Sequence, residues 1–250
     1  MNLKRFYSGK RVLVTGHTGF KGAWLSLILN ELGAKVHGIS LKPEDTRGNF
    51  YNIIKLNKKI KSNYINLVDY KKLAKSIEKI KPEIIFHLAA QPYVIRSYKN
   101  PLETIQSNIL GVSNLLDICR NIKTLKFFLN VTTDKCYEND DNKKAFKEMD
   151  NLGGKDIYSS SKACSEILTK SFYESFLKNN IAVGTARAGN VIGGGDFGED
   201  RLIPDIFESI INKNRLTIRN PNSIRPWQYI FDVLNGYLVQ TVMLKKIRKV

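Results

Sequence analysis

Two short stretches of the chain hold residue types that suit acid–base chemistry on an alcohol. The first, VTTDKCYEN, follows an apolar run and presents Thr133, Asp134 and Lys135 in succession. The second, YSSSK, places Tyr158 and Lys162 four residues apart, so on a helix both side chains project from one face. A nearby ammonium favours the phenolate and lowers the phenol's pKa. Tyr158 is therefore a candidate base for a substrate hydroxyl, and Thr133 a hydrogen-bond partner of that hydroxyl.

A glycine-rich loop near the N-terminus is a candidate dinucleotide site. TGHTGFKG places Gly16, Gly19 and Gly22 between a short β-branched run and an amphipathic segment, the context in which such spacing binds a pyrophosphate. Gly16 permits the tight turn, Gly19 lets the backbone approach the phosphates, and Gly22 permits close packing of helix on sheet. The helix N-terminus adds free N–H groups and partial positive charge. The alternative is that these glycines only turn the chain.

The choice between NAD and NADP stays open at the level of residue spacing. An acidic residue about twenty positions after the loop normally binds the ribose of NAD. Ser40 and Lys42 stand in that region, and Lys42 or Arg47 would suit a 2′-phosphate instead.

The elements that must position these residues alternate between buried strands and amphipathic helices. We expect strands at 11–16, 34–41, 62–67, 83–90, 126–133 and 181–193. We expect helices at 22–33, 69–80, 101–122 and 158–177. This alternation predicts an α/β fold, a Rossmann-type doubly wound parallel sheet covered on both faces. Residues 1–190 would form the dinucleotide-binding domain. After them Gly, Pro and charges cluster, which predicts loops and small helices of an incomplete substrate lobe at 191–250.

Composition narrows the class of partner. The formal net charge of +17 comes from scattered lysines, without the basic stripe of a nucleic-acid binder, so we expect polyanionic small molecules and no nucleic acid. Three cysteines without a C-x-x-C pair indicate reduced thiols in a cytoplasmic protein. The three histidines share no ligand spacing with them, so we expect no metal. We expect neither a signal peptide nor a membrane-spanning segment.

Together these stretches resemble the extended short-chain dehydrogenase/reductase family, and within it they are similar to the CDP-glucose 4,6-dehydratases. The resemblance extends over nearly the whole chain. The glycine loop and Y-x-x-x-K mark only the superfamily. The blocks TGHTGFKGAW, TDKCYEN and RAGNVIGGGD are far more specific. The resemblance also includes HLAAQPYVIRSYKNP, DRLIPD and IRNPNSIRPWQ. The resemblance implies NAD as cofactor, CDP-glucose as substrate, a role in surface polysaccharide biosynthesis, and a homodimer or homotetramer.

The implied reaction has three stages: oxidation at sugar C4, loss of water across C5 and C6, and return of the hydride to C6. A C4 ketone acidifies the C5 proton, and the C6 hydroxyl needs an acid to leave. We expect Asp134 to be that acid, and Lys135 to be the C5 base or to stabilise the enolate. Alternatively Lys135 is a surface lysine paired with Asp134. An epimerase on the same fold, which expels no water, is the competing function.

The resemblance also implies binding residues by position. Around the cofactor we expect Gly16, Thr18, Gly19, Phe20, Lys21, Gly22, Ser40, Asn66, Leu67, Leu88, Ala89, Ala90, Gln91, Asn108, Val131, Tyr158, Lys162 and Ala188. Around the sugar nucleotide we expect Arg96, Asn190, Arg201, Leu202, Ile203, Arg219 and Arg225. Arginine pairs bidentately with phosphate oxygens, although a surface ion pair is an equal alternative for each arginine.

Three departures from the family pattern qualify these expectations. The chain ends at Val250, whereas the family continues into a fuller sugar-nucleotide lobe. We therefore expect the chain to retain cofactor binding more readily than turnover. An inactive cofactor-binding remnant is a third possible function. Asn66 stands where relatives carry an Asp for the adenine amino group, a bond that its amide oxygen can also accept. The polar stretch at 140–146 replaces tryptophans, and we expect it to dock differently.

Overall fold

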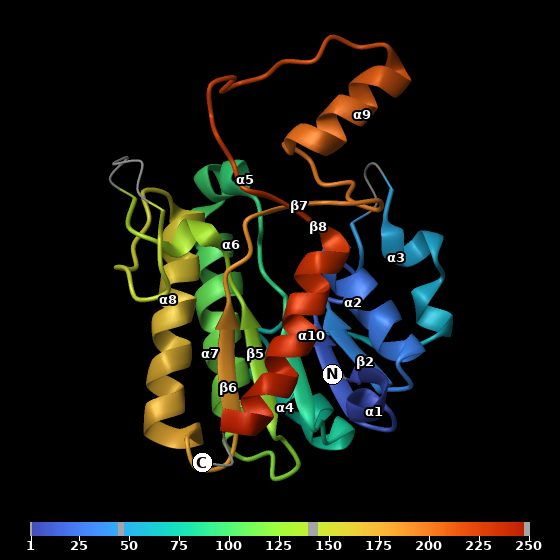
Figure 1. The fold of residues 1–250 in the computed structure, drawn as a ribbon, viewed down its shortest axis with the longest axis vertical. Helices are drawn as coiled ribbons and strands as arrows, with labels where there is room; N and C mark the ends of the chain where they lie inside the picture. The colour runs from blue at the N-terminus through green and yellow to red at the C-terminus, as the bar shows by residue number, and fades with distance from the viewer. Residues whose placement is uncertain (1, 45–47, 140–144, 248–250) are drawn as a thin grey trace.

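A parallel sheet with the Rossmann strand order forms the centre of the molecule. The structure, a computed structural model, describes residues 2–44, 48–139 and 145–247. Within these ranges six strands pair in the order β3-β2-β1-β4-β5-β6, every pair parallel (Figure 1). They are β1 (Arg11–Thr15), β2 (Lys35–Ser40), β3 (Lys61–Tyr64), β4 (Ile84–His87), β5 (Phe127–Val131) and β6 (Ala182–Ala186). The predicted fold class is confirmed, and the order reverses between β1 and β4, where such sheets bind ligands.

Helices cover both faces of this sheet. Strand side chains alternate between the faces: Val12 and Val14 pack on one side, and Leu13 on the other. The first face is covered by α1 (Leu3–Tyr7), α2 (Phe20–Glu31), α3 (Phe50–Ile53) and α10 (Ile230–Ile247). The second face is covered by α4 (Tyr70–Ile80), α7 (Gly111–Cys119) and α8 (Ile157–Phe172) (Figure 1). The strands are thereby buried on both sides, as their near-continuous apolar runs predict.

Local sequence signals explain where the helices begin and end. Asp69 caps α4, because its side chain accepts a hydrogen bond from the Lys72 backbone N–H at 3.1 Å. In α2, Leu25 and Leu29 of the predicted apolar stripe are fully buried. Gly33 follows α2 with φ of 82°, a left-handed conformation that glycine adopts without strain.

The long helix predicted at 101–122 is interrupted by a wider turn. Following α5 (Val94–Lys99), it consists of α6 (Pro101–Ile105), a π-helical turn (Gln106–Leu110) and α7. A π turn inserts an extra residue and re-aims a side chain, often at a functional site. Here the turn contains Asn108, which is buried. A second π turn, Tyr173–Leu177, ends the helix of α8.

The C-terminal part departs from the sequence-based expectation in two ways. The strand predicted at 181–193 is wrong beyond Ala186: β7 (Asn190–Ile192) leaves the sheet and pairs with β8 (Trp227–Tyr229). The expectation of only loops and small helices after 190 is also wrong. Helix α10 packs against β5 and β6, and Gln240 donates a hydrogen bond to the Thr185 carbonyl at 2.8 Å. The domain boundary near residue 190 stays a prediction.

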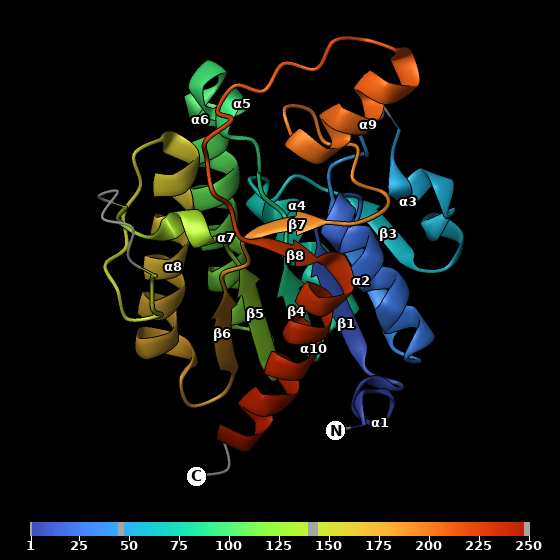
Figure 2. The same cartoon turned by 45° about the horizontal axis from the view of Figure 1, so that its top comes forward.

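Helix α9 (Leu202–Asn212) stands apart from these layers (Figures 1 and 2). None of its residues is buried, and Phe207, Ile210 and Ile211 of its apolar face are exposed. Over the residues that the structure describes, no helix is both long and apolar enough to cross a bilayer.

Candidate active site

The predicted catalytic and cofactor residues gather at the carboxyl-terminal edge of the sheet. The glycine loop follows β1, the Ala89–Gln91 segment follows β4, and the Thr133–Lys135 segment follows β5. Figure 2 shows the β7–β8 pair lying over this edge, with α9 beyond it. Because parallel strands end together, side chains from distant parts of the chain meet there.

The glycine loop is packed so tightly that two of its glycines leave no room for a side chain. A Cβ on Gly16, whose φ is +76°, would lie 2.7 Å from the Ala89 backbone nitrogen. A Cβ on Gly22 would lie 2.0 Å from the Gly16 carbonyl oxygen. A Cβ on Gly19 would make only an ordinary van der Waals contact, 3.4 Å from the Gly16 carbonyl oxygen, and no side chain among the described residues caps the α2 N-terminus at Gly19. The cradle therefore fits a dinucleotide pyrophosphate, which the free N–H groups of that terminus would hold.

Gly22→Ala should disrupt this cradle. The new methyl group forces the loop away from α2, and we expect a loss of about 1–3 kcal/mol in the free energy of unfolding together with weaker dinucleotide binding. Gly236→Ala is the matched control, since Gly236 lies in α10 with nothing near its Cβ position and Ala should stabilise the helix by about 0.5–1 kcal/mol. Thermal unfolding and NADH fluorescence titration measure both effects. Parental affinity in Gly22→Ala would contradict the cradle.

The structure brings together the three groups predicted to act on a substrate alcohol. Thr133, Tyr158 and Lys162 are all buried. The Thr133 hydroxyl lies close enough to the Tyr158 phenol to affect its pKa, and Lys162 Nζ donates to the Val131 carbonyl at 3.0 Å. Tyr158 is the second residue of α8, whose N-cap Asp156 accepts a hydrogen bond from the Ser159 N–H. The helix start thus fixes the phenol beside the end of β5.

Burial sets the protonation of this cluster. Burial raises the pKa of Tyr158 to about 12, against the effects of the Thr133 hydroxyl and the positive charge of Arg201. In the protein alone, desolvation of the phenolate outweighs the nearby cations. The predicted lowering also includes the positive charge of a bound nicotinamide, so it stays a prediction. Burial also lowers the pKa of Lys162 to about 8, opposed by the charge of Glu166. At neutral pH the phenol is protonated and the lysine is mostly an ammonium.

Asp134 and Lys135 lie beside this cluster on a 3₁₀ turn, Asp134–Cys136. The Thr133 hydroxyl is 3.1 Å from Asp134 Oδ1, and Lys135 Nζ is 3.6 Å from the same oxygen. Lys135 Nζ is also 3.4 Å from Asn190 Oδ1. Both charged side chains are about a third exposed. The ion pair between Lys135 and Asp134 that the alternative interpretation expected is present. It lies next to the predicted catalytic residue Thr133 and to Asn190, a predicted substrate residue.

Lys21 of the glycine loop reaches into the same space. Its Nζ lies 3.5 Å from the hydroxyl of Tyr237 on α10. Burial, together with the charges of Lys162 and Arg201 and against those of Asp134 and Asp196, lowers the pKa of Lys21 to about 7. Lys21 thus lies close enough to Lys162, Arg201 and Asp134 for their charges to act on it. Sequence reasoning missed Tyr237, because nothing in the sequence of α10 distinguishes it from a core tyrosine.

Arg201 is held over the site by an acidic residue that sequence reasoning also missed. Its Nη1 lies 2.9 Å from Asp196 Oδ1 and 3.1 Å from Asp196 Oδ2. Its guanidinium carbon is 5.1 Å from the centre of the Tyr93 ring, and its charge acts on Tyr158. The predicted substrate residues Leu202 and Ile203 follow it at the start of α9. In the sequence, Asp196 looks no different from the other acids of its glycine-rich segment.

A buried amide connects the loop after β4 with the helix of Tyr158. Asn108 Oδ1 accepts the Gln91 N–H at 2.8 Å, and Asn108 Nδ2 donates to the Gln91 carbonyl at 3.1 Å and to Ser161 Oγ at 2.9 Å. Ser161 Oγ donates in turn to the Tyr158 carbonyl at 2.7 Å. The π turn aims Asn108 at this position, which holds the predicted lining residues Leu88, Ala89 and Ala90 relative to Tyr158.

The residues predicted for the adenosine side lie at the ends of β2 and β3. Thr18 Oγ1 and Ser40 Oγ are 2.9 Å apart. Asn66 Oδ1 accepts the Val68 N–H at 3.1 Å, which leaves one lone pair for an adenine amino group. Leu67 packs against Gly111. Arg47 and residues 140–144 lie outside the described residues.

Three predicted substrate arginines are not gathered with the catalytic groups. Arg96 pairs with Glu103 at 2.7 Å and Glu44 at 3.0 Å. Arg219 pairs with Asp200 at 2.8 Å, and Arg225 is exposed between α9 and β8. For Arg96 and Arg219 the surface ion pair is therefore the arrangement found, whereas Arg201 points at the site.

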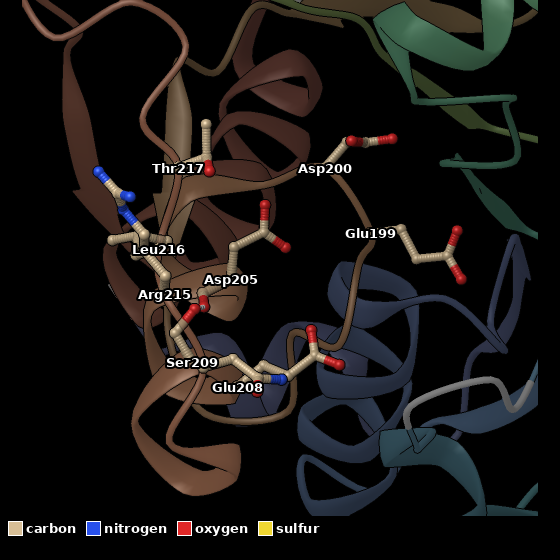
Figure 3. A pocket seen from close by; sticks show the side chains of 9 residues that line it. Glu199, Asp200, Asp205, Glu208, Ser209, Arg215, Leu216 and Thr217 are labelled. Atoms are coloured by element: carbon tan, nitrogen blue, oxygen red, sulfur yellow. Dashed lines mark hydrogen bonds between the residues drawn. The ribbon is translucent and has the colours of Figure 1, made fainter.

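A pocket of about 420 Å³ lies away from this chemistry, in the α9 region. Figure 3 shows that acidic side chains dominate its lining. Its residues are Glu199, Asp200, Asp205, Glu208, Ser209, Asn214, Arg215, Leu216 and Thr217. None of the catalytic groups lines it, so this hollow is not the reaction centre.

Sequence comparisons connect the chain with nucleotide-sugar dehydratases. Residues 13–247 match the family model for GDP-mannose 4,6 dehydratase. The chain is 46% identical over 242 residues to the CDP-glucose 4,6-dehydratase of Salmonella typhimurium strain LT2, covering 94% of this chain and 67% of that protein. It is 32% identical to a dTDP-D-glucose 4,6-dehydratase of Dictyostelium discoideum, covering 95% of this chain and 56% of that protein. The chain thus spans about half to two thirds of these relatives' lengths.

Comparison with solved structures agrees on the fold. The epimerase Mth375 from Methanothermobacter thermautotrophicus matches with a TM-score of 0.85 and 26% identity, covering 97% of this chain and 70% of that one. A UDP-glucuronic acid 4-epimerase from Bacillus cereus, solved with UDP-glucuronic acid and NAD, matches with a TM-score of 0.80 and 24% identity, covering 92% and 72%.

Proposed function

Because this chain belongs to the GDP-mannose 4,6-dehydratase family, we propose that it converts CDP-glucose to CDP-4-keto-6-deoxyglucose by removing water, with NAD as its cofactor. The 46% identity to the Salmonella CDP-glucose 4,6-dehydratase supports this substrate. The observation that carries the proposal is the position of Asp134 and Lys135 beside the Thr133–Tyr158 pair. An oxidation alone needs the buried phenol and hydroxyl, whereas an elimination also needs an acid and a base.

The first stage is the oxidation of the C4 hydroxyl. Tyr158 takes the hydroxyl proton while Thr133 holds the same oxygen through a hydrogen bond. The ammonium of Lys162 and the guanidinium of Arg201 stabilise the phenolate as it forms. The cradle around Gly16 and Gly22 would hold NAD, which would supply the hydride acceptor for C4 and the hydride donor for C6, so the overall reaction would be redox-neutral.

The second stage is the loss of water across C5 and C6. Asp134 delivers a proton to the leaving C6 hydroxyl, and Lys135 removes the C5 proton or stabilises the enolate. Because Lys135 Nζ and Asp134 Oδ1 are only 3.6 Å apart, both groups would act at the same end of the substrate. Asn190 contacts Lys135 and would orient its ammonium toward the sugar.

The setting of the reaction is part of the same proposal. The three cysteines are free thiols, which fits a reducing, cytoplasmic location. We also propose self-association as a homodimer or homotetramer through the α6–α7 and α8 surfaces. Leu102, Leu110 and Ile167 support this, since they are apolar and exposed on those elements.

Incubation with CDP-glucose and NAD tests the proposed function. Conversion to an alkali-labile 4-keto-6-deoxy product supports it. The control is dTDP-glucose under the same conditions, which tests whether turnover requires the cytosine base of the substrate. An isomeric hexose formed without loss of water would instead identify an epimerase. Dinucleotide binding without any product would identify an inactive remnant.

A further inference from the structure

A second group of buried polar side chains lies beneath the catalytic residues. Thr132 Oγ1 donates a hydrogen bond to one carboxylate oxygen of Glu166. Arg187 Nη2 donates to the other carboxylate oxygen at 3.0 Å. The side chains of Glu166 and Arg187 are only 4% and 16% exposed. The proposed chemistry uses none of these three groups, so their burial needs another explanation.

Each of the three groups belongs to a different catalytic segment. Thr132 directly precedes Thr133 at the end of β5, and Glu166 lies one helical turn after Lys162 on α8. Arg187 follows β6, where the Ala186 and Ala188 carbonyls accept the backbone N–H groups of Thr132 (2.9 Å) and Asp134 (3.2 Å). A displacement of Glu166 would therefore be transmitted to all three segments.

Arg187 also contacts two residues that lie between Lys135 and Tyr158 in the sequence, Tyr137 and Glu148. Its Nη1 donates to the Glu148 carbonyl at 3.0 Å, and its guanidinium carbon is 4.9 Å from the Tyr137 ring centre. Two backbone hydrogen bonds close this segment: Glu138 N–H to the Asn151 carbonyl, and Gly153 N–H to the Cys136 carbonyl, each at 2.9 Å. The ion pair thus lies between the catalytic turn and the segment that returns to α8.

Stability alone does not account for a buried pair of this kind. The desolvation of two charges offsets much of their attraction, and well-packed apolar side chains are often as stable. Arg187 Nε is buried and lacks a hydrogen-bond partner among the described residues, so the pair is not optimised for hydrogen bonding.

We propose that Glu166 is a positioning residue: through Thr132 and Arg187 it fixes the turn of Thr133 to Lys135, and its charge faces Lys162. The inference rests on the proposed function, since it assumes that those residues act on substrate. Glu166 itself touches no reacting atom, and its effect passes through Thr132, Arg187 and Lys162.

The charge of Glu166 gives this role a signature that packing alone would lack. The groups that face Lys162 are Glu166 on α8, Cys136 on the 3₁₀ turn, His87 on β4 and Lys21 on α2. Burial lowers the pKa of Lys162 to about 8, while Glu166 opposes that change. Without the carboxylate, the ammonium would lose its proton at a lower pH. The alkaline limb of the C4 oxidation rate would then move to lower pH.

Glu166→Gln tests the inference, since it keeps the length and the acceptor for Thr132 but removes the charge. We expect the Lys162 resonance of ¹³C-lysine-labelled protein to titrate at lower pH than in the parent. We expect amide hydrogen exchange at Glu138 and Gly153 to accelerate by about tenfold, as for the loss of a hydrogen bond to a charged group. In the turnover assay kcat should fall while KM is retained. Glu174→Gln, which removes an exposed partner of Lys178, should change none of these.

Two further variants separate position from charge. Glu166→Asp retains the carboxylate and should restore the Lys162 titration. In the double variant Glu166→Gln with Arg187→Met no buried charge is left unpaired, so its unfolding temperature should recover while the Lys162 shift remains. The double variant also carries the test if Glu166→Gln alone does not fold. A Lys162 titration and amide exchange unchanged from the parent would overturn the inference. These readouts need no turnover, so they stand even if the proposed reaction fails.

Discussion

Tyr158→Phe should reduce the oxidation of CDP-glucose by about 10²–10⁴-fold, the usual contribution of a positioned acid–base group. The substitution removes only the phenolic oxygen, and the ring keeps its place in a site where Tyr158 is 9% exposed. Folding and dinucleotide binding should therefore be unchanged. The absorbance of reduced nicotinamide in a single turnover measures the step directly.

Tyr98→Phe provides the matched control, because Tyr98 is 70% exposed on α5 and its hydroxyl should not affect the rate. The pH dependence gives a second check. Tyr158 has a pKa of about 12 in the protein alone, so proton removal at neutral pH depends on the positive charge of the oxidised nicotinamide and on the Lys162 ammonium. The oxidation rate should rise with pH and decline as Lys162, with a pKa of about 8, loses its proton. Oxidation at the parental rate in Tyr158→Phe would remove the phenol from the mechanism.

The features that could be predicted from the sequence are those set by local pattern. The glycine loop is recognisable because a tight turn between strand and helix admits few residue types, and the structure leaves no room for a Cβ at Gly16 or Gly22. The pairing of Tyr158 with Lys162 follows from helical spacing alone. Asp69 at the start of α4 is a cap because its side chain accepts a nearby backbone N–H.

The features that could not be predicted depend on contacts between distant segments. Asp196, Tyr237 and Glu166 acquire their roles from partners on other elements or across a loop. The direction of the Tyr158 pKa depends on burial, which residue spacing does not reveal. The strand predicted at 181–193 fails because apolar residues continue past Ala186 although the chain turns away toward β8. The sequence pattern predicts helices and strands, but which charged side chains lie close together depends on the tertiary fold.

Lys135→Ala should separate oxidation from elimination. The variant keeps Thr133, Tyr158 and Lys162, so it should still oxidise C4. It loses the group proposed to act at C5, and we expect formation of the 4-keto-6-deoxy product to fall by about 10²–10⁴-fold. Reduced nicotinamide should then accumulate on the protein, because no C6 acceptor for the hydride is formed. Lys170→Ala, an exposed lysine of α8, should behave as the parent.

Lys135→Arg distinguishes the two roles proposed for this lysine. Arginine keeps the positive charge beside Asp134 but does not give up its proton in proteins. If Lys135 is the C5 base, the Arg variant should trap reduced nicotinamide as the Ala variant does. If its charge stabilises the enolate, the Arg variant should retain elimination while the Ala variant does not. If both variants turn over like the parent, Lys135 has only the ion-pair role that its 3.6 Å contact with Asp134 provides, and Asp134 would be left as the only charged group of the 3₁₀ turn available for the elimination.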